Sequence, residues 1–394
     1  MTASARCRQT GLTRPEEAAI SAQQQSPSAD GNSLVDILRL IRSENVGPLT
    51  YHRLVRRFGS ARASLDALPD LARAGGRRRP VKIPPAEEVE REIAAARSLG
   101  AILLTYLDSY YPRWLAETED APPVIGVLGS AELLTRPMVG IVGARNASAN
   151  GRNYARKLAR ELGEGGFVIA SGLARGIDAA AHEGALPTGT VGVLGCGLDV
   201  IYPPQNRDLF LRMSEDAAII SEFPAGTAAQ AANFPRRNRL ISGMSRAVAV
   251  IEANRRSGSL ITARLALEQG REVFAVPGFP LDPRSEGPNW LLRQGAQLLE
   301  RADDIIEELA TRTRLPETPQ WPAETEFSCP DERAFSSREA KSSLISLLSS
   351  TPVTVDELLD ECQLSHQEAA SALLEMELAG RLERLPGNRI AALI

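Results

Sequence analysis

The sequence predicts an α/β protein built around a mostly parallel β-sheet. From about Met138 to Leu309, short runs of β-branched and other apolar residues alternate with helical stretches, and glycine or serine bounds each run. Unbroken apolar strands separated by helices are typical of a parallel sheet that is covered on both faces. The expected strands are 138–142, 167–170, 190–194, 217–220, 247–251 and 272–276.

The segments on either side of the sheet have different patterns. A chain of 394 residues exceeds what one hydrophobic core usually serves, so two or three domains are expected. The N-terminal part has the spacing of short amphipathic helices, and the C-terminal part that of three helices with a hairpin, the outline of a winged helix. We expect a disordered tail, a helical domain, the sheet domain, a proline-rich linker and a winged helix over 1–32, 33–85, 86–309, 310–338 and 339–394.

Composition excludes several classes of protein. No apolar run approaches the roughly 18 residues that a bilayer-spanning helix needs, and the first residues lack the apolar region of a secretory signal. The four cysteines are far apart and form neither a disulfide framework nor a zinc motif. We therefore expect a cytoplasmic protein without membrane partner, metal or cofactor. Because the net charge is −4, an anionic partner must be bound by a local cluster of cations.

The N-terminal helices resemble a helix-hairpin-helix around Asn45-Val46-Gly47-Pro48. In such a hairpin, backbone amides at the start of the second helix can face a DNA phosphate. Nearby arginines, including Arg53, Arg57 and the run Arg77-Arg78-Arg79, could add positive charge. The alternative is a plain helical packing module.

Two glycine-rich loops follow the first two strands. The first contains Gly143, Ala144, Arg145 and Ser148, which suit the capping of a helix and the binding of a phosphate at its N-terminus. Its G-x-x-G spacing is not a dinucleotide fingerprint, so an NAD enzyme is disfavoured. The second loop offers a further set of small residues and one cation, namely Ser171, Gly172, Ala174, Arg175 and Gly176.

Asp178 and His182 lie one helical turn apart just after the second loop. A metal site or an acid–base pair is conceivable at this spacing, but no third ligand is evident. The alternative is that Asp178 orients the loop while His182 bonds to Asp178 or to backbone, shaping a loop whose amides meet phosphate. We expect the structural role.

The strongest site begins with Phe234 and continues with Arg236, Arg237, Asn238 and Arg239. Arginines at a helix start form an anion site, and an adjacent aromatic ring can stack an unpaired base, so this pattern favours single-stranded nucleic acid. A fourth loop, with hydroxyls that open another helix, contains Ser257, Gly258, Ser259 and Thr262. Several phosphate loops along one sheet edge fit a polynucleotide better than one nucleotide.

These motifs, in this order, resemble the DNA-processing protein A family (DprA, also called Smf), over roughly Tyr111 to Leu309. The connecting pieces also match, including Ser221-Glu222-Phe223-Pro224, Ile251-Glu252 and Val276-Pro277-Gly278. The resemblance implies an extended Rossmann-like domain that binds single-stranded DNA, forms a homodimer, protects incoming DNA and loads the recombinase RecA, notably in natural transformation. The resemblance also implies that the protein catalyses no reaction and that Glu222 and Glu252 are structural residues of the family motifs.

The expected third helix of the winged helix, Ser365 to Ala379, contains glutamates but no lysine or arginine. Insertion into a DNA groove would place these carboxylates against phosphates, so a protein–protein or self-association role is favoured. The wing arginines Arg381, Arg384 and Arg389 leave a phosphate contact open.

The chief rival function is that of a nucleotide phosphoribohydrolase of the lysine decarboxylase-like family, which shares a related sheet. Enzymes of that family have a P-G-G-x-G-T-x-x-E signature. The comparable loop here, Ser257 to Arg264, has no glutamate at the required offset. A passive scaffold is a second rival, but it leaves the arginines around Asn238 without a purpose.

Overall fold

The computed structural model describes residues 31–314 and, beyond them, 344, 347–348, 351–362, 366–385 and 389–393. The expected tail over 1–32 and the expected linker over 310–338 lie largely outside the described residues, as does most of the first winged-helix helix. Residues 310–314, expected in the linker, instead continue a helix that begins at Ala302. The chain divides into two compact units. One contains residues 90–314, and the other combines residues 31–89 with the described part of the winged helix.

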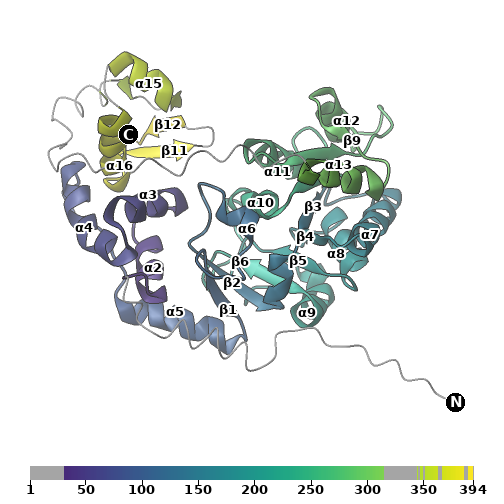
Figure 1. Cartoon of the computed structure of the whole chain (residues 1–394), viewed down its shortest axis with the longest axis horizontal. Helices are drawn as coiled ribbons and strands as arrows, with labels where there is room; N and C mark the ends of the chain where they lie inside the picture. Colours follow the sequence, from purple (N-terminus) through teal and green to yellow (C-terminus); the bar gives the residue numbers. More distant parts are fainter. Residues whose placement is uncertain are drawn as a thin grey trace. The chain divides into compact units, whose positions relative to one another are not determined.

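The first unit is built on a nine-stranded sheet with the order β1-β2-β6-β5-β4-β3-β7-β8-β9 (Figure 1). All six predicted strands are present, each within one residue of its expected ends. They are β3 (Met138–Val142), β4 (Val168–Ser171), β5 (Thr190–Val193), β6 (Ala218–Ser221), β7 (Ala247–Val250) and β8 (Glu272–Ala275). Neighbours among these six pair in parallel, as expected.

Three further strands extend this parallel core and were not predicted. β1 (Ile102–Thr105) and β2 (Val124–Gly129) pair with each other in antiparallel fashion, and β2 pairs antiparallel with β6. The two-residue β9 (Gln297–Leu298) continues the parallel pattern beyond β8. The sheet is therefore mixed at one edge, where β1 and β2 pair in antiparallel fashion. Both strands precede the alternating strand–helix region of the sequence.

Helices cover both faces of the sheet, and strand alternation decides which residues face which layer. Along β3, Met138 and Val142 belong to the core under one face, whereas Val139 and Ile141 belong to the core under the other. The first core includes residues of α10 (Asn233–Met244) and α11 (Gly258–Glu268). The second core includes residues of α7 (Ala149–Glu164), α8 (Ile177–Ala185) and α13 (Ala302–Arg314). The remaining helices of this region are α5 (Ala86–Ser98), α6 (Arg113–Ala116), α9 (Arg207–Asp216) and α12 (Glu286–Arg293).

The second unit contains three N-terminal helices, α2 (Leu34–Ile41), α3 (Pro48–Phe58) and α4 (Ala61–Ala74). With them belong α15 (Val355–Cys362), α16 (His366–Leu378) and a small sheet of order β10-β12-β11. The strands of this sheet are β10 (Val353–Thr354), β11 (Leu382–Leu385) and β12 (Arg389–Ala392). This arrangement is that of a winged helix, as predicted. No helix in the described part of the chain is long and apolar enough to cross a bilayer.

Candidate anion-binding and stacking site

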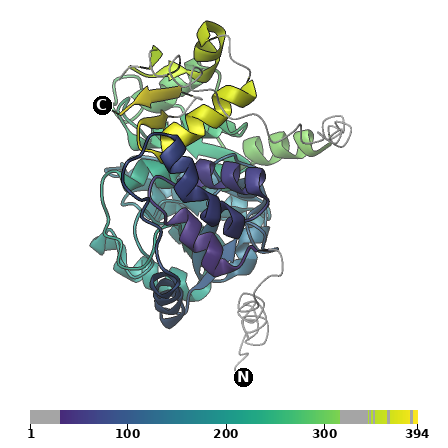
Figure 2. The same cartoon turned by 90° about the vertical axis from the view of Figure 1, so that its left-hand side faces the viewer.

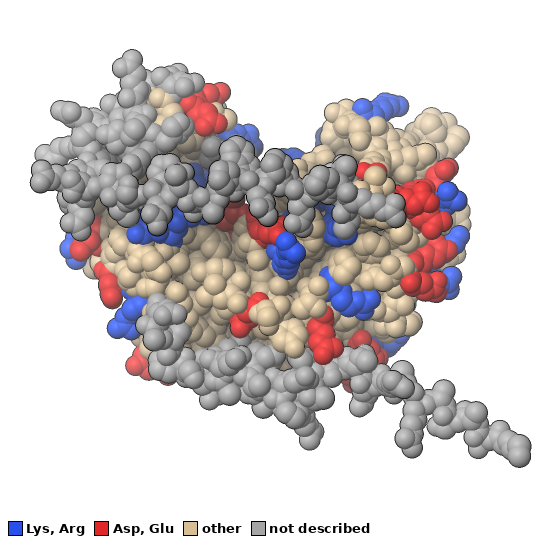
Figure 3. Space-filling model, viewed as in Figure 1, with Lys and Arg blue, Asp and Glu red and all other residues tan. Residues whose placement is uncertain are grey.

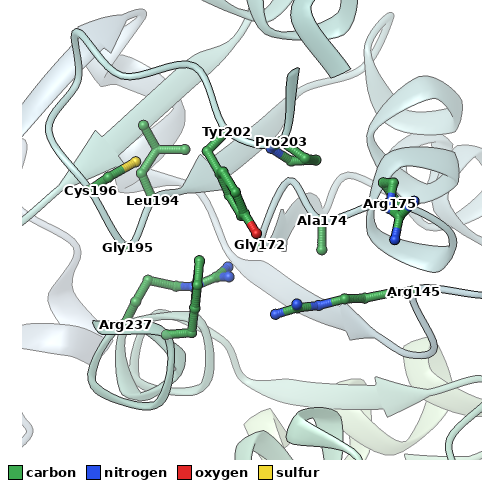
Figure 4. Close-up of a pocket in the computed structure, with 11 residues that line it drawn as sticks. Arg145, Gly172, Ala174, Arg175, Leu194, Gly195, Cys196, Tyr202, Pro203 and Arg237 are labelled. Carbon is green, nitrogen blue, oxygen red and sulfur yellow. The ribbon is translucent and has the colours of Figure 1, made fainter. Parts of the chain in front are cut away.

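A pocket lies at the carboxyl ends of β4 and β5, the edge at which open parallel sheets bind ligands. Its walls come from the loops after β3, β4 and β5 and from the start of α10 (Figure 4). The lining residues are Arg145, Gly172, Ala174, Arg175, Leu194, Gly195, Cys196, Tyr202, Pro203, Phe234 and Arg237. Among them are three arginines and two aromatic rings, but neither Asp nor Glu, so the pocket suits an anion with a flat apolar group.

Aromatic rings and guanidinium groups meet inside this pocket. The ring centroids of Tyr202 and Phe234 are 5.4 Å apart, with an angle of 33° between their planes. The guanidinium carbon of Arg145 is 5.3 Å from the Phe234 centroid, and that of Arg237 is 6.0 Å from it. Figure 4 shows Arg145 and Arg237 extending toward one another, with the Tyr202 ring above them. Such a cluster can stack a nucleobase and attract a phosphate at one point.

Arg237 forms the buried, positively charged floor of the pocket. Only 4% of the residue is exposed, and its Nη1 donates a hydrogen bond to the Val193 carbonyl at 3.0 Å. Burial lowers the pKa of Arg237 to about 10, although the carboxylate of Asp178 opposes this shift. The guanidinium therefore remains charged at neutral pH. Gly172 makes room for it, since a Cβ at that position would lie 1.7 Å from Nη1.

Asp178 shapes the loop after β4 from within. Its Oδ2 accepts hydrogen bonds from the amides of Gly172 and Ala174, at 3.1 and 3.4 Å. Burial raises the pKa of Asp178, while Arg237 and these two amides lower it. The Ser171 hydroxyl is also used internally, because it donates to the Ile141 carbonyl at 2.6 Å. The Asp178 carboxylate therefore holds this loop, and the two amides point to the carboxylate and not to an incoming phosphate.

His182 lies beneath the loop and is fully buried. Its Nδ1 is 2.7 Å from the hydroxyl of Thr190, which itself donates to the Ile169 carbonyl. The hydroxyl can therefore only accept from Nδ1–H, so Nδ1 carries the proton when the ring is neutral. Burial, with a smaller contribution from Arg237, lowers the pKa of His182 to about 3. His182 bonds to Thr190 and not to Asp178, and the two do not form the acid–base pair considered above.

The loop after β3 contributes only Arg145 to the pocket. Gly143 packs against α8, where an added Cβ would lie 2.6 Å from Ile177. Ser148 caps α7 by accepting from the Gly151 amide, and both its amide and its hydroxyl donate to the carboxylate of Glu252, at 2.8 and 2.5 Å. The N-terminus of α7, expected to bind phosphate, therefore already holds a carboxylate of this chain.

The loop after β7 is also satisfied internally. Ser257 caps α11 and lies 2.7 Å from the Ser259 hydroxyl, and Thr262 is buried. Only Gly258 at the start of the helix is open, with nothing within 4 Å of the position of an added Cβ. Asn238 donates to the Gly258 carbonyl at 3.3 Å. The structure does not bring these hydroxyls into the pocket.

Arg236 and Arg239 differ from Arg237 although they lie on the same helix. Arg239 is 8% exposed and forms a buried ion pair with Glu222; it also donates to the Asp120 carbonyl. It thereby fastens the segment before β2 to α10. Arg236 is exposed, with its guanidinium carbon 5.5 Å from the Phe223 ring centroid, and does not line the pocket.

Sequence reasoning did not single out the segment after β5 as part of the site. Tyr202 supplies the second aromatic ring, and Cys196 is buried against the pocket with its pKa raised to about 11, mainly by burial. The position of this segment could have placed it in the site, because it follows β5 and the loops after the neighbouring strands carry other site residues. On the face seen in Figure 3, basic and acidic residues are interspersed where the atoms are not grey. The positive charge of the site comes from the arginines that line it, Arg145, Arg175 and Arg237.

Three family models match this chain. The one described as DNA recombination-mediator protein A covers residues 102–310. A DprA-like N-terminal HHH domain matches residues 32–95, and a DprA winged helix domain matches residues 330–388.

Known proteins match as well. Protein Smf of Escherichia coli is 38% identical over 310 residues, which are 78% of this chain and 81% of that protein. DNA processing protein DprA of Bacillus subtilis is 42% identical over 228 residues, which are 57% and 77% of the two chains. The crystal structure of DNA processing protein A from Streptococcus pneumoniae has a TM-score of 0.58 at 34% identity, covering 70% of this chain and 96% of that one. A structure of the Helicobacter pylori protein, described for its single-stranded DNA binding mode, has a TM-score of 0.50 at 32% identity and covers 54% and 96%.

Proposed function

The chain belongs to the DNA recombination-mediator protein A (DprA) family, and from that premise we propose that it binds single-stranded DNA at the pocket around Phe234. The observation that carries this proposal is the meeting of Arg145 and Arg237 with the rings of Phe234 and Tyr202. Bases in a duplex are stacked on their neighbours, whereas an unpaired base is free to enter such a pocket. Single strands are therefore preferred to duplexes.

The same proposal extends to the handling of the strand. The protein protects incoming single-stranded DNA and delivers it to the RecA recombinase, in DNA uptake and natural transformation, as a cytoplasmic homodimer that catalyses no reaction. Family membership supports this role.

The test is a fluorescence titration of a labelled oligothymidylate, and of a duplex of equal length, at two salt concentrations. Phe234→Leu keeps an apolar side chain but removes the ring, so binding should weaken by about 1–3 kcal/mol, the value of one base–aromatic stack. Arg145→Ala should reduce the slope of log affinity against log salt by about 0.7.

Arg160→Ala serves as the matched control for the titration. This exposed arginine lies near the C-terminal end of α7, which runs from the carboxyl edge of the sheet toward the opposite edge. Its removal should leave affinity and salt slope unchanged. Equal binding by the parent, Phe234→Leu and Arg145→Ala would show that the strand binds elsewhere.

Delivery to the recombinase needs its own measurement. On strands coated with a single-stranded DNA-binding protein, the parent should shorten the lag before RecA hydrolyses ATP, and Phe234→Leu should not. The rival hydrolase activity is tested by incubating the parent with AMP and measuring free adenine by chromatography. Release of adenine by the parent but not by Arg237→Ala would favour the enzyme.

A further inference from the structure

The hairpin between α2 and α3 contacts the C-terminal end of α16, although more than 300 positions separate them in the chain. Asn45 Nδ2 donates to the Leu378 carbonyl at 3.2 Å and so caps the end of α16. The Thr50 hydroxyl donates to Glu377 Oε1 at 2.7 Å. In Figures 1 and 2, α16 lies beside the N-terminal helices of the same unit.

The C-terminal end of α4 packs closely against α16. A Cβ at Gly75, the last residue of the α4 turn, would lie 1.9 Å from the Glu375 carbonyl oxygen and 3.0 Å from the Ala379 Cβ. Gly75 has a φ of −71°, which any residue adopts, so the glycine is required for space and not for backbone conformation. Thr50 is 1% exposed, and Glu377 also accepts from Arg384 of the wing at 3.1 Å.

Burial along α16 shows that two of its sides are covered. Leu373 and Met376 belong to the core of the winged helix. Leu374 and Glu375, which point elsewhere on the helix, are buried as well, at 4% and 7% exposure. A helix at the surface of a free winged helix would expose one face. The second face of α16 is covered by α4 and the hairpin.

We propose that the hairpin and α4 form a docking site for the winged helix of the same molecule, held through Asn45, Thr50 and Gly75. Docking covers the third helix of the winged helix, which is the helix that reads a groove in helix-turn-helix proteins. It also turns the hairpin loop, expected to face a phosphate, toward the end of α16. Neither surface is then offered to duplex DNA, and the winged helix acts as an internal protein-binding module.

The test is hydrogen exchange of the full chain, measured by mass spectrometry on peptides from the hairpin and from the end of α16. Gly75→Ala leaves the α4 backbone allowed but introduces the clash with Glu375, so exchange in both segments should rise by roughly tenfold or more. Thr50→Val, which removes the hydrogen bond to Glu377 at nearly constant volume, should raise it in the same segments. Gly47→Ala is the matched control, because an added Cβ there meets nothing within 4 Å.

Three outcomes would overturn the proposal. Unchanged exchange in both Gly75→Ala and Thr50→Val would show that the segments are not docked. A loss of protection on dilution of the parent would show that the occupant is the winged helix of a second copy. Added protection of either segment by a blunt DNA duplex would show that these surfaces remain open to nucleic acid.

Discussion

Two regions at the carboxyl edge of the sheet have similar sequences and different structures. The loops after β4 and β5 and the start of α10 form a pocket, to which the loop after β3 contributes only the side chain of Arg145. The loops after β3 and β7 have equivalent glycines and hydroxyls, but Ser148 is bonded to Glu252, and Ser257 to Ser259. The amides and hydroxyl of the loop after β4 also have partners within the chain. The pocket is therefore distinguished by the guanidinium groups that line it, those of Arg145, Arg175 and Arg237.

The strand order explains this difference. β3 and β7 are adjacent and parallel, so Glu252, which follows β7, comes to lie beside Ser148, which follows β3. A carboxylate at the N-terminus of a helix is stabilised by the helix dipole, just as a phosphate would be. The pocket lining contains neither Asp nor Glu, and Asp178 is buried and bonded to the amides of Gly172 and Ala174.

Arg239 is paired within the protein, whereas Arg145 is exposed to solvent. Removal of the Arg239 side chain has the largest expected effect on stability. Arg239→Ala leaves the Glu222 carboxylate buried without its cation, which should lower the free energy of unfolding by about 3–5 kcal/mol. Arg145 is exposed, so Arg145→Ala should leave stability nearly unchanged while weakening DNA binding. Urea titration of both variants measures the difference. A stable Arg239→Ala variant with weak DNA binding would reverse the assignment of the two residues.

The layer beneath the pocket should make stability depend on pH. The pKa of His182 is about 3 in the folded protein, below its ordinary value of 6.5. Between pH 3 and pH 6.5, the His182 ring therefore takes up a proton only in the unfolded chain. Stability should therefore fall as pH decreases from 6.5 toward 3, by up to about 1.4 kcal/mol per pH unit, and this contribution should be constant above 6.5. The His182→Gln variant should lack that part of the slope. Parallel urea titrations at several pH values measure it, and identical slopes would place His182 in a solvated site.

A pair of glycine variants compares the two regions directly. Gly172→Ala forces the Arg237 guanidinium to move, because the new Cβ would lie 1.7 Å from Nη1. The overpacking should cost about 1–3 kcal/mol in stability. The displaced guanidinium also loses its contact with the bound strand, worth about 1.5–3 kcal/mol, which should raise the Kd for single-stranded DNA by about tenfold or more. Gly258→Ala meets nothing within 4 Å and should bind like the parent. Should only Gly258→Ala weaken binding, the strand would lie at α11.

Glu252→Gln gives the smallest expected effect. The amide oxygen of the glutamine can still accept from the Ser148 amide, and the Ser148 hydroxyl can accept from the new NH2 group instead of donating to a carboxylate. The negative charge at the N-terminus of α7 is lost, at a cost of about 0.3–1 kcal/mol in stability. Affinity for single-stranded DNA should not change, because this helix end does not line the pocket. Thermal unfolding and the same oligonucleotide titration measure the two quantities. Tighter DNA binding by Glu252→Gln would show that the α7 terminus competes for phosphate after all.

The alternation of strands and helices could be predicted from local pattern alone, because apolar runs bounded by glycine are visible along the chain. Sequence reasoning located β3 to β8, the helix start at Phe234 and the winged helix. It did not predict β1 and β2, which are short and pair antiparallel at the edge. It also did not distinguish Arg237 from Arg239, since both are arginines on one helix.

Which polar groups remain available to a ligand depends on how the strands and helices pack together. The partners of Ser148, Arg239 and Thr50 lie 104, 17 and 327 positions away in the chain. No local pattern contains such distant pairings. They arise from strand order and helix packing, and a buried charge or hydroxyl takes whichever partner that packing brings to it, because leaving it unpaired costs several kcal/mol.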